Sequence, residues 1–98
     1  MIHLTHSGSF NQTLANRFKA LGHPTRLAIV QYLLKVNHAH CGEIVKVMPV
    51  SQSTVSQHLK ELKTAGILQS REEGTAVDYF IKTDTLRDLN RYLSLLCP

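Results

Sequence analysis

Residues 51–68, SQSTVSQHLKELKTAGIL, determine the fold of this chain. Ser51 can cap a helix, because its hydroxyl can accept a free backbone N–H of the first turn. Gly66 suits the left-handed position that commonly ends a helix. The apolar residues between them are Val55, Leu59 and Leu62. Because these recur at i, i+4 and i+7, the stretch predicts an amphipathic helix with one buried face.

The opposite face of this helix carries polar and basic side chains, without a carboxylate or a large apolar group. Its residues are Gln52, Ser53, Ser56, Gln57, Lys60 and Lys63. A plain solvated face usually alternates Glu and Lys, so this composition favours a surface that meets nucleic acid. Glutamine can pair with adenine through two hydrogen bonds, serine can contact several base edges, and lysine neutralises phosphate. The face therefore predicts binding to double-stranded DNA.

The composition predicts one globular domain, residues 1–98. With 98 residues, 43% of them apolar, the chain is long enough for a single modest core. No run approaches the ~20 apolar residues that a membrane helix needs. The N-terminal MIHLTHSGSF lacks the basic and apolar blocks of a signal peptide. We therefore expect a cytoplasmic protein with no membrane partner, and a flexible arm at residues 1–10.

Basic residues dominate the first part of the chain. The net charge is +4, and residues 1–40 contain four basic residues and no acid. Residues 41–98 contain seven basic and seven acidic residues, which cancel. A basic excess suits a polyanionic partner, although many proteins of this charge bind no nucleic acid.

Hydrophobic spacing and stop signals predict three helices before residue 51, at residues 11–21, 24–35 and 41–48. Pro24 suits the first turn of the second helix, where its missing N–H costs nothing. The polar residues 37–40 predict a turn. Pro49 ends the third helix, because the residue before proline avoids helical geometry. Two helices joined only by Pro49 and Val50 make a helix-turn-helix.

The remainder of the chain predicts a hairpin and a last helix. Strands are expected at residues 67–71 and 77–81, joined by a turn at 72–75, and this hairpin is a wing. A helix at residues 83–96 carries Leu86, Leu89, Leu93 and Leu96 as a narrow coiled-coil-like seam. At the end of a chain such a seam favours docking of a partner helix. The predicted fold is mainly α with a small β-hairpin, a dimeric winged helix-turn-helix of order α-α-α-α-β-β-α.

Three segments in order resemble the ArsR/SmtB family of small dimeric bacterial repressors. They are FKALGHPTRLAIVQYLL (18–34), CGEIVKVMPVSQSTVSQHLKELKTAGIL (41–68) and REEGTAVDYFI (71–81). The resemblance implies an operator-binding repressor that releases DNA when it senses a signal. It also implies a homodimer built on the first and last helices. The expected interface residues are Leu14, Phe18, Leu86, Leu89, Leu93 and Leu96.

The resemblance also assigns the DNA contacts. The residues expected to contact bases and phosphates are Gln52, Ser53, Ser56, Gln57 and Lys60, with Lys63 on the same face. Ser51 and Thr54 are expected near the DNA backbone. Arg71 and Thr75 in the wing are expected beside the minor groove or phosphates. Glu72 and Glu73 suit phosphate badly, so the wing should touch DNA only lightly. His58 lies at the edge of the buried face and is expected to be packed rather than to contact DNA.

Three hypotheses remain open for the sensed signal. Relatives often bind metal through a C-x-C pair on the third helix or through Asp and His on the last helix, and neither set is complete here. The cluster His38, His40 and Cys41 instead favours Zn(II) or a similar thiophilic metal, and His3 and His6 lie on the N-terminal arm. A second hypothesis is a thiol-reactive signal at Cys41 and Cys97. The third is a regulator without an inducer site.

Two other classes of protein are less consistent with the sequence. An enzyme is not expected, because Ser56 and His58 point to different faces of one helix and cannot pair as nucleophile and base. The alternative is a winged helix that serves as a protein-interaction module without DNA binding. Such modules usually carry acids or apolar groups on the exposed recognition face, which this helix lacks.

Overall fold

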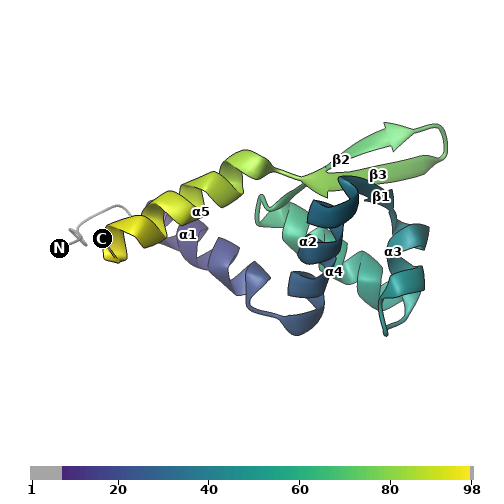
Figure 1. The fold of residues 1–98 in the computed structure, drawn as a ribbon, viewed down its shortest axis with the longest axis horizontal. Coiled ribbons are helices and arrows are strands. Elements are labelled where there is room, and N and C mark those ends of the chain that lie inside the picture. Colours follow the sequence, from purple (N-terminus) through teal and green to yellow (C-terminus); the bar gives the residue numbers. More distant parts are fainter. Residues whose placement is uncertain (1–7, 98) are drawn as a thin grey trace.

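The structure, a computed structural model, describes residues 8–97, which form five helices and three strands (Figure 1). The helices are α1 (Gly8–Leu21), α2 (Pro24–Val36), α3 (Cys41–Val47), α4 (Gln52–Thr64) and α5 (Thr83–Leu96). The strands are β1 (His38–His40), β2 (Leu68–Glu73) and β3 (Ala76–Ile81). The predicted winged helix-turn-helix is confirmed, with one strand more than expected. Because α1 begins at Gly8, residues 8–10 are helical, and the rest of the predicted arm lies outside the described residues.

The segment predicted as a polar turn, residues 37–40, is mostly a strand. β1 pairs with β3 in antiparallel fashion, with Ala39 opposite Tyr79, and the sheet order is β1-β3-β2. Three residues with histidine at both ends are too few and too polar to show the period of a strand. Asn37 makes the turn alone, with a left-handed φ of 77° that asparagine tolerates. The prediction of a turn at 37–40 was therefore wrong except at its first residue.

The wing hairpin is longer than the sequence indicates. Only Gly74 and Thr75 form its loop, where a turn at residues 72–75 was expected. Gly74 has a φ of 62°, and two-residue hairpin loops require such positive φ values. Strand pairing therefore continues through Glu72 and Glu73.

The core lies between α2, α3, α4 and the base of the sheet. Its fully buried apolar side chains are Ile29, Leu33, Ile44, Val55, Leu59, Leu62, Ile67 and Leu68. The buried residues of α4 are those predicted from the spacing, together with His58. Since α4 is held by this apolar stripe, its polar face is turned to solvent.

Both predicted ends of α4 are confirmed. Ser51 is the N-cap, and its Oγ accepts the backbone N–H of Thr54 at 3.3 Å. After the helix, Gly66 adopts a left-handed φ of 79°. Its carbonyl accepts a hydrogen bond from the Thr85 hydroxyl at 2.7 Å, which ties the end of α4 to the start of α5.

Helices α1 and α5 lie against each other at the end of the molecule that is opposite the wing (Figure 1). The ring centroids of Phe18 and Tyr92 are 6.1 Å apart, which joins the two helices. Beyond this contact, Leu93, Leu95 and Leu96 are 49%, 68% and 50% exposed. The described part of the chain, residues 8–97, contains no helix long and apolar enough to span a lipid bilayer.

Candidate nucleic-acid interface

The polar face of α4 is exposed along its whole length. The residues of this surface, called the reading face below, are Gln52, Ser53, Ser56, Gln57, Lys60 and Lys63, and each is exposed. The buried stripe on the other side fixes the rotation of α4, so the core determines which residues are presented. The reading face can offer hydrogen-bond donors, acceptors and positive charge to a partner.

The start of α4 is a further favourable place for an anion. Its first turn contains no acid, so the partial positive charge of the free N–H groups is not cancelled there. The Ser51 hydroxyl also lies 3.1 Å from Ser53 Oγ and 3.0 Å from Thr54 Oγ1. These hydroxyls order the helix start, where the family resemblance predicts that Ser51 and Thr54 lie near the DNA backbone.

A cleft of about 410 Å³ beside the reading face extends the positive surface to α1. It is lined by Gln57 and Lys60 of α4, Lys19 of α1 and Arg26 of α2, among others. Arg26 forms an ion pair with Glu61, which leaves Lys19 and Lys60 as the cations available to a ligand there. The sequence did not single out Lys19, because only the packing of α1 against α4 brings it to this cleft.

His58 is packed behind the reading face, as predicted. The residue is 8% exposed, and its ring centroid lies 4.6 Å from that of His23. Arg26 Nη1 is 3.4 Å from His58 Nδ1. Burial, then the neighbouring His23 and Arg26, lower the pKa of His58 below its ordinary value near 6.5, against a smaller opposite effect of Glu61. The imidazole is therefore favoured in its neutral form inside the fold.

In the wing, Thr75 is exposed at the loop, but Arg71 already has a partner. Arg71 Nη2 donates to Asp78 Oδ2 at 3.2 Å, and its guanidinium lies 5.4 Å from the centre of the Phe80 ring. Asp78 is fully buried. Burial alone would raise the pKa of Asp78, but the hydrogen bonds and charges of His38 and Arg71 together bring it below its ordinary value. Arg71 of β2 therefore already has a structural role, because its guanidinium contacts Asp78 and Phe80 of β3.

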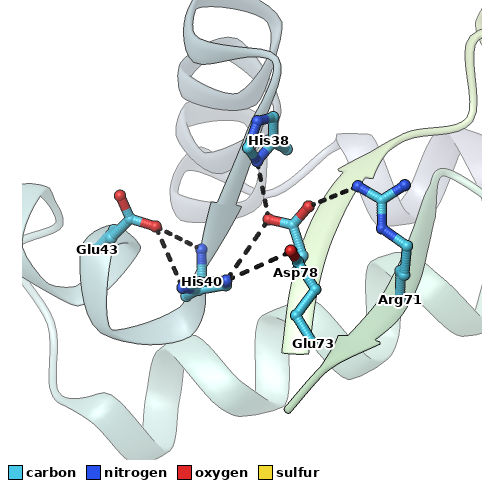
Figure 2. A network of polar contacts seen from close by, with 6 residues as sticks. All are labelled: His38, His40, Glu43, Arg71, Glu73 and Asp78. Atoms are coloured by element: carbon cyan, nitrogen blue, oxygen red, sulfur yellow. Dashed lines mark hydrogen bonds and ion pairs between the residues drawn. The ribbon is translucent and has the colours of Figure 1, made fainter. Parts of the chain in front are cut away.

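The predicted metal residues do not all meet. His38 Nδ1 lies 3.0 Å from Asp78 Oδ1, and His40 Nε2 lies 3.9 Å from the same oxygen (Figure 2). Cys41 Sγ instead lies 3.6 Å from Ser56 Oγ on α4. A metal site of His38, His40 and Cys41 stays a prediction, and the structure directs Cys41 toward α4 rather than toward the two histidines. The residues that do join them, Asp78 and Glu73, were not identified from the sequence, because they lie far along the chain in the strands of the wing.

The predicted interface residues lie on α1 and α5 with different exposures. Leu14, Phe18 and Leu86 are half-buried, and Leu93 and Leu96 are exposed. Leu89 is only 4% exposed and belongs to the core of the protomer. It therefore supports α5 from inside and has little surface to offer a partner.

Comparisons with known proteins agree with this geometry. A family model described as bacterial regulatory protein, arsR family, matches residues 23–70. An HTH-type transcriptional regulator of Methanocaldococcus jannaschii is 39% identical over 75 residues, 76% of this chain and 84% of that protein. The cadmium resistance transcriptional regulatory protein CadC of Listeria innocua is 35% identical over 72 residues, 74% of this chain and 60% of that protein.

The likeness extends to solved structures. The crystal structure of the transcriptional repressor PagR of Bacillus anthracis superposes with a TM-score of 0.73 at 28% identity, and the match covers 89% of this chain and 99% of that one. The relatives are transcriptional regulators, a class that is not enzymatic. With its helix-turn-helix, its wing and these relatives, the chain belongs to the arsR family of bacterial DNA-binding transcriptional regulators.

Proposed function

We propose that this chain is a homodimeric repressor that acts in the cytoplasm and binds an operator through α4. The observation that carries the proposal is the exposed, acid-free reading face on a helix whose rotation is fixed by the core. A helix of 13 residues with this chemistry fits the major groove, where base edges are distinguishable.

The contacts divide by chemistry. Gln52, Ser53, Ser56 and Gln57 face the base edges, where amides and hydroxyls can discriminate sequence. The residues for the phosphates and the DNA backbone are Ser51, Thr54, Lys60, Lys63 and, from α1, Lys19. Thr75 at the wing loop lies beside the adjacent minor groove, and Arg71 reaches phosphate only with the nitrogens that Asp78 does not use.

The dimer forms through α1 and α5. Their surface includes Leu14, Phe18 and Leu86 and the exposed Leu93 and Leu96. Exposed leucines gathered near the end of one helix, beside half-buried apolar residues of its neighbour, are typical of an interaction surface. A second copy that covers this surface places two copies of α4 on the same side of one DNA duplex.

Release from the operator is proposed to follow a chemical signal, either a metal ion or a thiol-reactive compound. The relative CadC is named for cadmium resistance, which makes a metal a natural candidate. Cys41 is partly buried and Cys97 is exposed, and both are free thiols. A ligand shifts the equilibrium between two conformations only when it binds one of them more tightly. The signal must therefore bind more tightly to a dimer conformation in which the two α4 helices no longer match the operator.

The test compares DNA binding by the wild type and by a Gln57→Ala, Lys60→Ala double variant. Fluorescence anisotropy is measured over a range of salt concentrations on a duplex that the wild type enriches from a random library. We expect affinity to fall by at least about tenfold, since one bidentate base contact contributes about 1–3 kcal/mol. The slope of log affinity against log salt concentration should also become shallower by about one unit for each phosphate that Lys60 neutralises in the wild type.

The matched control is Lys35→Ala, which removes the same charge from the last turn of α2, outside the reading face. Its affinity should stay near that of the wild type. Circular dichroism of each variant checks the fold. Equal affinity of the double variant and the wild type would show that α4 does not present its reading face to DNA.

A further inference from the structure

We propose that His40, Glu73 and Asp78 form a binding site for a first-row divalent cation such as Zn(II), which joins the wing to the start of α3. Their ligand atoms all lie within 4.8 Å of one another. Any role of the ion in regulation rests on the proposed DNA-binding function, whereas binding of the ion does not.

Strand register brings these side chains to one face of the sheet. His40 lies opposite Asp78 across β1 and β3, and Arg71 lies opposite Asp78 across β2 and β3. Directly opposite residues in an antiparallel pair share a face. Glu73 is two residues beyond Arg71 on β2 and so lies on the same face, whereas Glu72 points to the other. The backbone pairing therefore places the three side chains on one face of the sheet, and their rotamers set the distances between the ligand atoms.

The distances fit a small cation after slight closure. His40 Nε2 lies 3.7 Å from Glu73 Oε1 and 3.9 Å from Asp78 Oδ1 (Figure 2). Ligand bonds of about 2.0–2.2 Å in a tetrahedral site place donor atoms about 3.3–3.6 Å apart. Shifts of a few tenths of an ångström at Glu73 and His40, both partly exposed, close the two distances from His40. The oxygens of Glu73 and Asp78 start within 4.8 Å of each other, and the exposed Glu73 side chain can turn to bring them closer. Water would fill the remaining position.

Supporting groups lie beside two of the three ligands, and hydrogen bonds already hold Asp78 in place. A metal-bound histidine usually directs its second ring nitrogen to a carboxylate. Here His40 Nδ1 lies 3.6 Å from Glu43 Oε1, which also accepts the His40 backbone N–H at 2.9 Å. His38 Nδ1 and Arg71 Nη2 hold the two oxygens of Asp78 at 3.0 and 3.2 Å. The arrangement leaves His40 Nε2 directed toward Glu73 and Asp78 (Figure 2).

The local charge also favours a dication. The cluster contains the carboxylates of Glu43, Glu73 and Asp78, and one guanidinium, that of Arg71 (Figure 2). With neutral histidines this is an excess of two negative charges, in a chain whose net charge is +4. A divalent ion would cancel this excess.

The donor set selects the class of metal. One imidazole and two carboxylates suit zinc-like first-row ions, whereas soft ions such as trivalent arsenic prefer thiolates. Cys41 is the nearest thiol in the sequence, but its sulfur is directed to Ser56 on α4. The site therefore differs from the set His38, His40 and Cys41 that the sequence suggests.

The experiment titrates chelator-treated, reduced protein with Co(II), followed by absorption, and with Zn(II) in competition with a chromophoric chelator. We expect one ion per protomer and weak metal-centred bands without thiolate charge transfer. His40→Gln and Glu73→Gln should each weaken Zn(II) binding by more than about tenfold, because removal of a residue that only orients a metal ligand already costs about 10–100-fold.

Two variants serve as matched controls. Glu72→Gln removes the same charge from the other face of β2, and Cys41→Ser removes the neighbouring thiol; both should bind Zn(II) like the wild type. No binding, equal binding by all four variants, or an intense thiolate charge-transfer band would each overturn the site. DNA binding by the same proteins in excess chelator is measured separately, so failure of the metal site leaves the test of the DNA-binding proposal intact.

Discussion

His58 shows how a single residue of α4 can serve the fold rather than the DNA. It lies among the buried residues of the same helix, with His23 and Arg26 against its ring and Glu61 one turn further along. A charged imidazole at this position would lose hydration and meet the positive charge of Arg26. The folded protein therefore favours the neutral imidazole, and the stability of the packing between α4 and the core depends on pH.

This linkage predicts a loss of stability in mild acid. The pKa of His58 is lowered in the folded state, so between the folded and unfolded values the unfolded chain binds more protons. The free energy of unfolding should be highest above the ordinary value near 6.5 and fall as pH drops through the folded value. Urea denaturation of the wild type and His58→Gln from about pH 7.5 to about pH 5.5 measures this difference. Parallel pH profiles for the two proteins would contradict the assignment.

Local rules predicted single residues well where the decisive partner is near in sequence. Ser51 and Gly66 were identified as the ends of α4, because a cap and a left-handed residue depend on only a few neighbours. Asp78 is the contrasting case. Its partners His38 and Arg71 meet it only through strand pairing, so the sequence shows merely an acid within an apolar strand, VDYFI.

Among the elements, the helices were predicted closely and the short strand β1 was missed. Helices can be recognised in a sequence from their capping residues, their helix-breaking residues and the 3.6-residue period of their apolar positions. A strand of three residues has no such pattern, and β1 exists because β3 offers it a free edge. The missed strand is also the element that carries His38 and His40, which is why their contacts with Asp78 and Glu73 could not be predicted from the sequence.

The proposed contact of α1 and α5 with a second copy of the chain leads to a prediction about dimerisation. Leu93 is 49% exposed, and at a dimer interface Leu93→Glu would bury a charge without a partner, which is costly. We expect this variant to shift the protein from dimer to monomer by more than about tenfold in the dimerisation constant, measured by sedimentation equilibrium. Ser94→Glu adds the same charge to a neighbouring position of α5 and should remain dimeric. A monomeric wild type, or a Leu93→Glu dimer of unchanged stability, would exclude this interface.

The whole molecule is elongated, with principal extents of 46, 23 and 21 Å. α1 and α5 occupy one end and the wing the other (Figure 1). In a dimer formed through the end that contains α1 and α5, the packing of these helices sets the separation of the two α4 helices. In the proposed dimer, a change in the packing of α1 and α5 would alter the separation of the two α4 helices and so their match to DNA.

Reading of one operator by two copies of α4 is best examined by selection of duplexes from a random library, followed by footprinting on the enriched site. We expect a near-palindromic site whose half-sites lie about 34 Å apart, one turn of DNA, with protection on one side of the duplex. Binding to it should weaken steeply with salt. Failure to enrich any sequence, or enrichment of a single site without two-fold symmetry, would show that the two helices do not read DNA together.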